Sequence, residues 1–404
     1  MFKFYSKISF ASRVLIWMFL GSVLGLIFRD QILFVKPIGE IFLQLLIMAA
    51  IPLVFFNLLS GLTAIGTVQS FGKIGLKVIV YYFFSTAMAI TVGIGIMSWT
   101  EAGVGMQMKG DVPDDIGQMP DIGSLLMGMV PTNIVKSFAE GNLIQIVVFA
   151  ILLGVVVLNL PSGKKEWFQD GFERIAELMR KLVELILKAS PLGLGALMAA
   201  TFAEYGSGIV GSLTMFIGSV YLGQFIMVVF YMFLLKFIGK ISPIWFFKQT
   251  SALYATTVAT CSSLASLAVS LDIAEEKLKL PKKIFSFTLP LGAQFNKDGT
   301  SIMLSAILIF TAQAVGLEFS IGQMVQIVIV GLLISEGSTG IPGGGLVVAM
   351  LFAKAFNLPL EIVAIVGGIY RLIDMGNTTV NCMGDMVATS IISRLETNWK
   401  PNKI

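Results

Sequence analysis

The chain has 404 residues, of which 56% are hydrophobic and only 13% are charged, and its formal net charge is +4 at pH 7. Its mean hydropathy is +0.88. A soluble domain carries about 25% charged residues, so the composition excludes a soluble protein and predicts an all-α polytopic membrane protein. No basic run is long enough to bind nucleic acid, and Cys261 and Cys382 both lie in apolar stretches, so neither a nucleic-acid partner nor a disulfide framework is expected.

Five apolar runs in the first 240 residues are candidates for membrane-spanning helices, because a bilayer takes roughly 20 apolar residues to cross. They are Val14–Phe28, Ile41–Gly66, Val78–Trp99, Leu143–Leu160 and Ser207–Leu235. The first follows a basic segment without a small-residue cleavage site, so it is expected to be a helix and not a signal peptide.

One further helix is expected to be amphipathic. Charged residues recur at helical spacing over Phe168–Leu187, which predicts a helix that starts at the membrane interface and continues through Pro191 to Phe202.

Two apolar runs in the last 160 residues are interrupted by small and polar residues. Ile244–Leu271 contains Thr260-Cys261-Ser262-Ser263, and Ile327–Phe356 contains a glycine-rich stretch over residues 335–345. The flanking segments have at most about 12–15 residues, which is short for a hydrocarbon core of about 30 Å. We therefore predict two re-entrant helical hairpins, whose non-helical tips must be buried in protein or line a cavity.

The distribution of lysine and arginine predicts the orientation of the chain. The basic loops all fall on one side of the membrane if both termini are cytoplasmic, and the acidic loop 101–121 then falls on the other. The two hairpins enter from opposite faces in this arrangement, and each is followed by a spanning helix. We expect eight transmembrane helices, two hairpins and an inverted repeat in the cytoplasmic (inner) membrane, an arrangement typical of secondary transporters.

The sequence Asn-Lys-Asp-Gly-Thr at residues 296–300 interrupts the apolar segment 284–315. A charge at that depth costs several kcal/mol unless it is paired or lines a wet cavity, and Gly299 permits the backbone to unwind. Hard cations prefer carboxylate, amide and carbonyl oxygens. Asn296 and Asp298, with the carbonyls freed at the break, therefore predict a site of sodium size.

A polar face on the last helix predicts a second site. Asp374, Thr378, Asn381 and Asp385 follow one another at spacings of four, three and four residues, which places them on one side. A carboxylate there can hold a substrate ammonium, and an amide can hold a carboxylate. The alternative is structural, because Arg371 lies three residues before Asp374 and can pair with it inside a helical bundle.

Four motifs carry a family resemblance: Ser262-Ser263, residues 296–300, Gly340-Ile341-Pro342-Gly343, and the pattern from Asp374 to Asp385. Over essentially its whole length the chain resembles the dicarboxylate/amino acid:cation symporter family, the glutamate and neutral amino-acid transporters, as an atypical prokaryotic-type member. Inverted repeats are already described for that family. The resemblance implies a transporter and not an enzyme, built as a homotrimer. It also implies a static scaffold (residues 1–75 and 101–206) and a transport domain (76–100 and 207–404) that moves as an elevator.

By position, the resemblance also implies functional residues. Those for the substrate would be Ser262, Ser263, Thr300, Ile341, Gly343, Asp374, Asn377, Thr378 and Asn381. One sodium site would use Gly292, Asn296, Asn381 and Asp385. Another would use Tyr82, Ser85, Thr86, Asn296 and Asp298. The hydroxyl groups of the first three, which all lie in the span Val78–Trp99, can equally form hydrogen bonds between helices. Ser335 and Ser338 would contribute to a third. No cofactor is expected other than Na⁺ or H⁺.

The chain departs from the family where an acidic substrate would be recognised. Acidic-substrate members carry arginine at the position of Asn377 or at that of Cys261, and without a guanidinium a side-chain carboxylate loses its bidentate partner. We therefore predict a neutral amino acid, such as serine, threonine or alanine. The alternative is an acidic amino-acid symporter coupled to sodium or protons, in which Arg371 serves the side-chain carboxylate.

A second departure affects ion coupling, because Lys297 replaces a methionine of the family and Glu336 replaces an apolar residue. Both would lie near the third sodium site. We hypothesise that the Lys297 ammonium replaces a sodium ion and pairs with Glu336 when the second hairpin closes, which reduces sodium coupling or transfers it to protons through Glu336. In the alternative, Lys297 points into water and has no role. An uncoupled exchanger or a channel-like facilitator shares the same residues and remains open.

Overall fold

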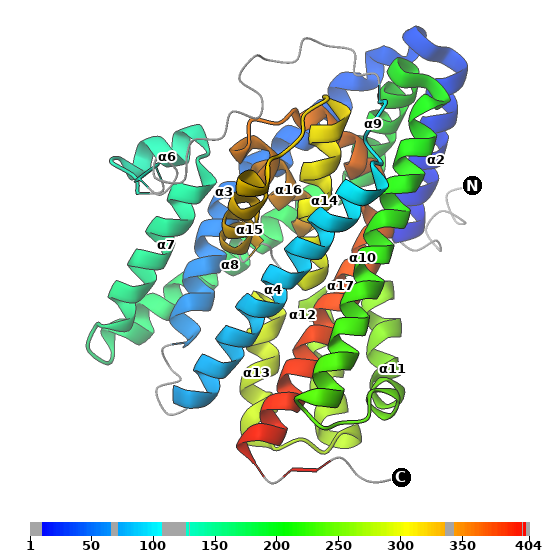
Figure 1. Cartoon of the computed structure of the whole chain (residues 1–404). Helices are drawn as coiled ribbons and strands as arrows, with labels where there is room; N and C mark the ends of the chain where they lie inside the picture. The colour runs from blue at the N-terminus through cyan, green and yellow to red at the C-terminus, as the bar shows by residue number, and fades with distance from the viewer. Residues whose placement is uncertain are drawn as a thin grey trace, which may run out of the picture.

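A computed structural model describes residues 10–65, 72–106, 127–128, 130–335, 343–397 and 399–400, and these form a bundle of helices (Figure 1). No β-strand occurs in these ranges, so the all-α prediction is confirmed for this part of the chain.

The N-terminal helices are α2 (Phe10–Phe28), the 3-10 turn η1 (Arg29–Val35), α3 (Lys36–Ile65) and α4 (Gly72–Thr100). They match the first three predicted spans. After residue 130 a short helix that the sequence did not predict, α6 (Ile134–Glu140), precedes α7 (Leu143–Leu158). The Asn133 side chain starts α6 by accepting hydrogen bonds from the backbone N–H groups of Val135 and Lys136, at 3.0 and 3.2 Å.

The amphipathic segment differs from its prediction, because it is two helices, α8 (Lys164–Leu187) and α9 (Ser190–Tyr205). Pro191 has no N–H, and its ring clashes with the carbonyl four residues earlier, that of Leu187, so α8 ends there. At the start of α8, the Glu166 carboxylate accepts hydrogen bonds from its own backbone N–H and from that of Gly163. These bonds stabilise the charged form and hold the pKa of Glu166 below its usual value. α8 packs on α3, whereas α9 packs on both α2 and α3.

The first predicted hairpin is found as α11 (Pro243–Thr260) and α12 (Ser263–Asp272), which pack against each other and follow η3 (Gly206–Gly208) and α10 (Ile209–Phe237). α11 is longer than the predicted flank. Between the two helices Cys261 adopts a left-handed conformation at φ +51°, and the Ser262 hydroxyl accepts a hydrogen bond from the Ala265 N–H at 3.1 Å to start α12. A π-helical turn, η4 (Ile273–Lys277), ends the segment.

The rest of the chain forms α13 (Lys282–Phe295), α14 (Asp298–Ala314), α15 (Ile321–Ser335), α16 (Gly344–Ala355) and α17 (Leu360–Glu396). α15 and α16 are the flanks of the second predicted hairpin. In Figure 1 the pairs α11–α12 and α15–α16 enter the bundle from opposite ends. α17 has 37 residues and is about 55 Å long.

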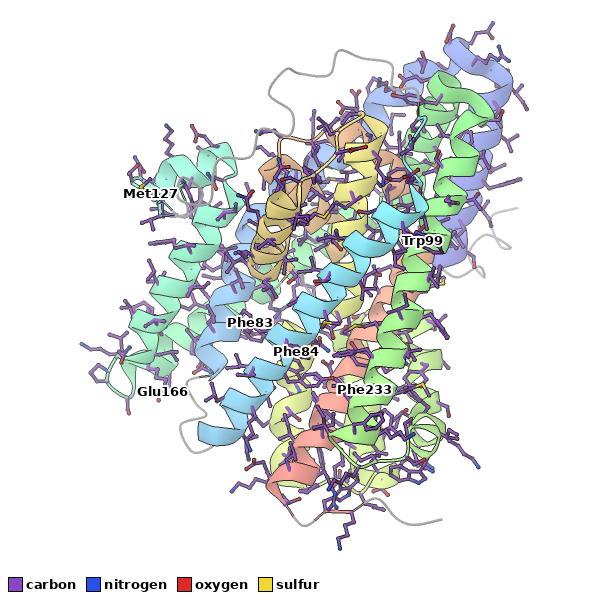
Figure 2. All side chains as sticks on the ribbon, in the orientation of Figure 1. Phe83, Phe84, Trp99, Met127, Glu166 and Phe233 are labelled. Carbon is purple, nitrogen blue, oxygen red and sulfur yellow. The ribbon has the colours of Figure 1, made fainter. Side chains whose placement is uncertain are left out.

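Large apolar side chains cover the outside of the bundle. Phe83, Phe84 and Trp99 on α4 and Phe233 on α10 are between 44% and 73% exposed (Figure 2). Within the described ranges, three helical stretches are long and apolar enough to cross a membrane, namely Ser12–Thr63, Ile74–Thr100 and Ser190–Phe237. A surface of this kind is energetically favourable against lipid and not against water.

Small residues allow two helix pairs to approach closely. A Cβ added to Gly21 or Gly25 of α2 would lie 2.1 Å from the Gly195 carbonyl oxygen or 2.4 Å from that of Ala199, both on α9. On α4, a Cβ added to Gly93 would lie 2.5 Å from the Ile302 carbonyl oxygen of α14. Such contacts are typical of helix packing in membranes, where small residues let backbones meet.

Candidate functional site

The break between α13 and α14 is buried, and the side chain of Lys297, which lies in the break, hydrogen-bonds to the carbonyls that end α13. Asn296 is extended (φ −81°, ψ 115°) and Lys297 precedes the first turn of α14. The Lys297 ammonium donates hydrogen bonds to the carbonyl oxygens of Ala293, at 2.7 Å, and Asn296, at 3.4 Å. With 1% of Lys297 exposed, the alternative in which it points into water is wrong.

Asp298 is fully buried and is held by hydroxyl groups from two other helices. One carboxylate oxygen accepts hydrogen bonds from Ser85, at 3.1 Å, and Thr86, at 3.0 Å, both on α4. The other accepts from the Tyr231 hydroxyl of α10 at 2.5 Å. Hydrogen bonds to a charged acceptor are stronger than neutral ones, so the carboxylate fixes α4 and α10 against α14.

Asn381 of α17 links its helix to both sides of the same break. Its side-chain oxygen accepts hydrogen bonds from the backbone N–H groups of Gly299 (2.8 Å) and Thr300 (3.4 Å), and its amide donates to the Thr300 hydroxyl at 3.2 Å. Its backbone carbonyl accepts from the Asn296 side chain at 2.9 Å. The Asn381 side chain therefore caps the N-terminus of α14.

A cluster of oxygen atoms surrounds Gly292 on α13. A Cβ there would lie 2.3 Å from an Asp385 carboxylate oxygen and 2.4 Å from the Tyr82 hydroxyl, so only glycine leaves room for both. The Asn296 side-chain oxygen and the same Asp385 oxygen are buried without a hydrogen-bond partner among the described residues. Lys297 interacts electrostatically with both Asp298 and Asp385.

The structure therefore brings two of the predicted sodium sets together, because Tyr82, Ser85, Thr86 and Asp298 lie beside the Asn296–Asp385 group. Carboxylate, amide and hydroxyl oxygens suit a hard cation, and two unpartnered buried oxygens fit one. Ser335 is buried at the end of α15, where its hydroxyl donates to the Leu332 carbonyl at 3.3 Å. Ser338, Glu336 and Ile341 lie outside the described residues.

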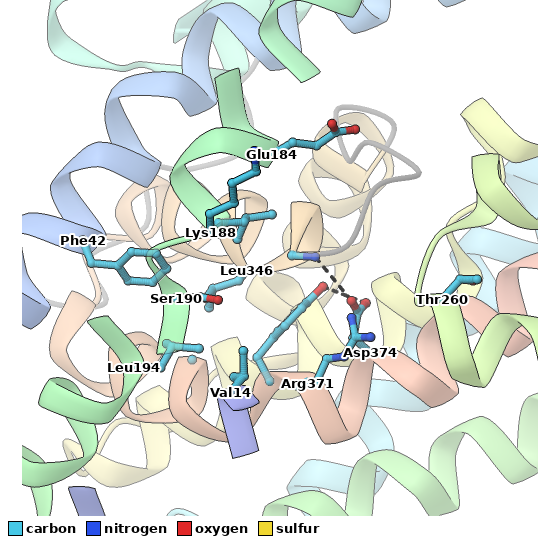
Figure 3. A pocket seen from close by; sticks show the side chains of 14 residues that line it. Val14, Phe42, Glu184, Lys188, Ser190, Leu194, Thr260, Leu346, Arg371 and Asp374 are labelled. Atoms are coloured by element: carbon cyan, nitrogen blue, oxygen red, sulfur yellow. Dashed lines mark hydrogen bonds between the residues drawn. The ribbon is translucent and has the colours of Figure 1, made fainter. Parts of the chain in front are cut away.

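Asp374 lines a cavity of about 440 Å³ that opens between α2, α3, α8 and α9 on one side and the end of α11, the start of α16 and α17 on the other (Figure 3). One Asp374 oxygen accepts a hydrogen bond from the Tyr370 hydroxyl at 2.9 Å, and the other from the Gly343 N–H at 3.4 Å. No ion pair joins Asp374 to Arg371 in the described part of the chain, so the structural pairing considered above is not found.

The other residues predicted for the substrate are distributed around this cavity and behind it. Gly343 lines it with Asp374. Ser262 caps α12, Ser263 and Thr300 are buried next to the helix breaks, and Thr378 and Asn381 are buried within α17. Asn377 does not line the cavity, because its side chain is fully buried, and its role in substrate binding stays a prediction. Its side chain accepts a hydrogen bond from Gln224 at 2.9 Å and donates to the Met303 sulfur at 3.2 Å.

Sequence reasoning missed Tyr231 and Tyr370, which hydrogen-bond to the two carboxylates. Tyr370 lies four residues before Asp374, so helical spacing was a signal for it. Tyr231 lies within an apolar run and 67 residues from Asp298, so nothing local distinguishes it from a lipid-facing aromatic residue.

Comparison with known proteins matches residues 10–395 to the sodium:dicarboxylate symporter family. The proton/glutamate-aspartate symporter of Bacillus subtilis (strain 168) is 31% identical over 396 residues, which cover 96% of this chain and 94% of the relative. The proton/glutamate-aspartate symporter of Escherichia coli (strain K12) is 30% identical, covering 98% and 95%. The C4-dicarboxylate transport protein of Bacillus subtilis (strain 168) is 29% identical, covering 97% and 94%.

These names bear on two predictions. The relatives are named for glutamate, aspartate and C4-dicarboxylates, so they do not support the predicted neutral amino acid. A further relative of Bacillus subtilis (strain 168), 29% identical, is named a proton/sodium-glutamate symport protein, so the names of the relatives include both ions. With its buried carboxylates, its broken helices and a match over nearly all of its length, the chain belongs to the sodium:dicarboxylate symporter family and is a membrane symporter, not an enzyme.

Proposed function

We propose that the protein imports an acidic amino acid together with sodium. The substrate ammonium binds Asp374, because an anion in a cavity at membrane depth attracts a cation. A C4-dicarboxylate without an amino group would meet the Asp374 carboxylate as a like charge. The names of the relatives support the acidic side chain.

The observation that carries this proposal is the position of Asn381. Asn381 lies two turns after Asp374 on α17. It is hydrogen-bonded to Asn296, Gly299 and Thr300 at the break between α13 and α14. A cation bound by Asp298, Asn296 and the hydroxyls of α4 would fix this break, and through Asn381 it would fix the helix that carries Asp374. Cation and substrate would then stabilise the same arrangement, which is what coupling requires.

Lys297 supports reduced sodium coupling. Its ammonium bonds to the Asn296 carbonyl and lies near Asp385, two of the residues predicted for one sodium site. A fixed positive charge beside these oxygens opposes the entry of a sodium ion, although the ammonium bonds to the Asn296 backbone and not to the unpartnered side-chain oxygens of Asn296 and Asp385. The Asp298 group, whose carboxylate oxygens accept hydrogen bonds from the hydroxyls of Ser85, Thr86 and Tyr231, is the site that sodium would use.

The elevator mechanism is part of the proposal. α2, α3, α7, α8 and α9 pack mainly on one another, and α4 packs on α10, α14, α15 and α17, which supports a scaffold of residues 1–75 and 101–206 and a transport domain of 76–100 and 207–404. The cavity at Asp374 has walls from both groups. We also propose a homotrimer in the cytoplasmic membrane with both termini cytoplasmic, on the basis of the family resemblance and the basic loops.

Uptake into proteoliposomes tests the function. An inward sodium gradient should concentrate labelled aspartate inside the vesicles, and Asp374→Asn should reduce uptake by about 100-fold or more, because it leaves the ammonium unpaired. Asp170→Asn on the exposed side of α8 is the matched control and should leave uptake unchanged. Equilibration without accumulation would identify a facilitator or channel, and accumulation driven only by a pH gradient would assign the coupling to protons.

A further inference from the structure

We propose that Arg371 binds the side-chain carboxylate of the substrate and so makes this site selective for acidic over neutral amino acids. The inference rests on the proposed function, because it concerns a second group of the amino acid whose ammonium binds Asp374.

Arg371 lines the same cavity as Asp374, three residues earlier on α17 (Figure 3). Its guanidinium makes one long hydrogen bond, from Nη2 to the Ala259 carbonyl oxygen near the end of α11, at 3.4 Å. Its Nε is buried without a partner among the described residues. The residue therefore brings a positive charge to the wall of the cavity, and among the described residues its guanidinium makes no hydrogen bond other than the long one to Ala259.

A carboxylate is the group that this arrangement fits. A guanidinium presents its donors as a planar fork that matches the two oxygens of a carboxylate, and an unpaired charge at membrane depth is costly until an anion binds. Arg371 and Asp374 together offer one positive and one negative group on adjacent turns of one helix. An amino acid with a second carboxylate complements both, whereas a neutral amino acid leaves the guanidinium unpaired.

The other candidates are less suitable. Asn377 is directed toward α10 and α14 and not into the cavity. Cys261 is uncharged, and its thiol donates to the Val258 carbonyl at 3.7 Å. Lys188 is the competing cation, because it lines the cavity from α8, but Figure 3 shows it on the wall opposite Arg371 and Asp374.

Aspartate and asparagine provide the test, since they have nearly the same shape and differ in the charge of the side chain. Each is titrated against purified full-length protein in saturating sodium, and the ratio of the asparagine to the aspartate dissociation constant is measured. The wild-type ratio should exceed 1. Arg371→Met should lower it by about 10- to 100-fold, the value of a charge-assisted bidentate contact. Arg371→Lys keeps the charge without the fork and should give an intermediate ratio. Lys188→Met is the matched control and should leave the ratio unchanged.

Three results would overturn the inference. They are a wild-type ratio near 1, an unchanged ratio in both Arg371 variants, and a ratio that collapses in Lys188→Met instead. The second includes an equal loss of aspartate and asparagine binding, which is the effect of a purely structural role. If wild-type protein binds no amino acid at all, the proposed function itself fails, and that result is distinct from the others.

Discussion

At the scale of single residues, the chain balances one buried charge with hydroxyl groups from neighbouring helices and the other with carbonyls at its own helix break. Asp298 has three hydroxyl donors, and Lys297 has the carbonyls that end α13. Removing one partner of a buried charge destabilises the protein by more than the net free energy of the contact, because the remaining charge is left buried and unpaired. Substitutions here should therefore change ion binding strongly and specifically.

Lys297→Met removes the fixed ammonium from the Asn296 carbonyl and the vicinity of Asp385. We expect sodium to enter in its place, so that the logarithm of aspartate affinity depends more steeply on the logarithm of sodium concentration, by about one unit of slope. Binding titrations at several sodium concentrations measure this slope. Lys282→Met, on the exposed start of α13, is the control. The surrogate-cation idea fails if the slope stays at the wild-type value in Lys297→Met and also in the double variant Lys297→Met/Glu336→Ile.

At the scale of helices, small residues decide which elements can meet. α2 and α9 pack so closely that glycine Cα atoms of α2 face backbone carbonyls of α9. A larger residue there could be accommodated only by a shift of a whole helix. Glycines on lipid-facing surfaces have no such constraint. The same residue type therefore has different effects at different positions, depending on whether another backbone lies opposite.

Gly25→Ala should lower the stability of the protein, because the new Cβ would lie 2.4 Å from the Ala199 carbonyl oxygen. Overpacking of this kind costs about 1–3 kcal/mol. Gly218→Ala on α10 is the matched control, since nothing lies within 4 Å of its added Cβ, and it should be neutral or slightly stabilising. Thermal unfolding of both variants in detergent measures the difference. Equal melting temperatures would contradict the predicted close packing of α2 on α9.

At the scale of the whole molecule, the proposed transport cycle depends on movement between two groups of helices. α9 and α17 belong to different groups and contact each other, because a Cβ on Gly368 would lie 2.1 Å from the Met198 methyl group. If the transport domain slides past the scaffold, this contact must break during each cycle. A covalent link across it should therefore stop transport while leaving the binding site intact.

The variant Met198→Cys/Gly368→Cys, in a Cys261→Ser/Cys382→Ala background, tests this movement. Cross-linking with a mercury salt should abolish aspartate uptake by proteoliposomes, preserve aspartate binding in detergent, and be reversed by a thiol. Thr257→Cys/Thr379→Cys is the control pair, because both residues lie in the proposed transport domain with their hydroxyl oxygens 2.8 Å apart. Uptake that continues after the first pair is cross-linked would argue against an elevator.

The sequence by itself determined the membrane class, the broken helices and the residues near the two carboxylate sites. These features are local: hydropathy decides that a segment enters the bilayer, and Gly, Pro and Ser decide where a helix ends. It also placed Asp374, Asn381 and Asp385 on one face, because helical spacing alone does so.

Only the tertiary structure decided which side chains meet. It turned Asn377 toward Gln224, brought Tyr231 to Asp298, directed Lys297 to the carbonyls of its own helix break, and left Arg371 facing the cavity without an ion pair to Asp374. The reason is physical. Spacing along the chain fixes the angles between residues of one helix, but the rotation of that helix against its neighbours depends on how residues far apart in sequence pack.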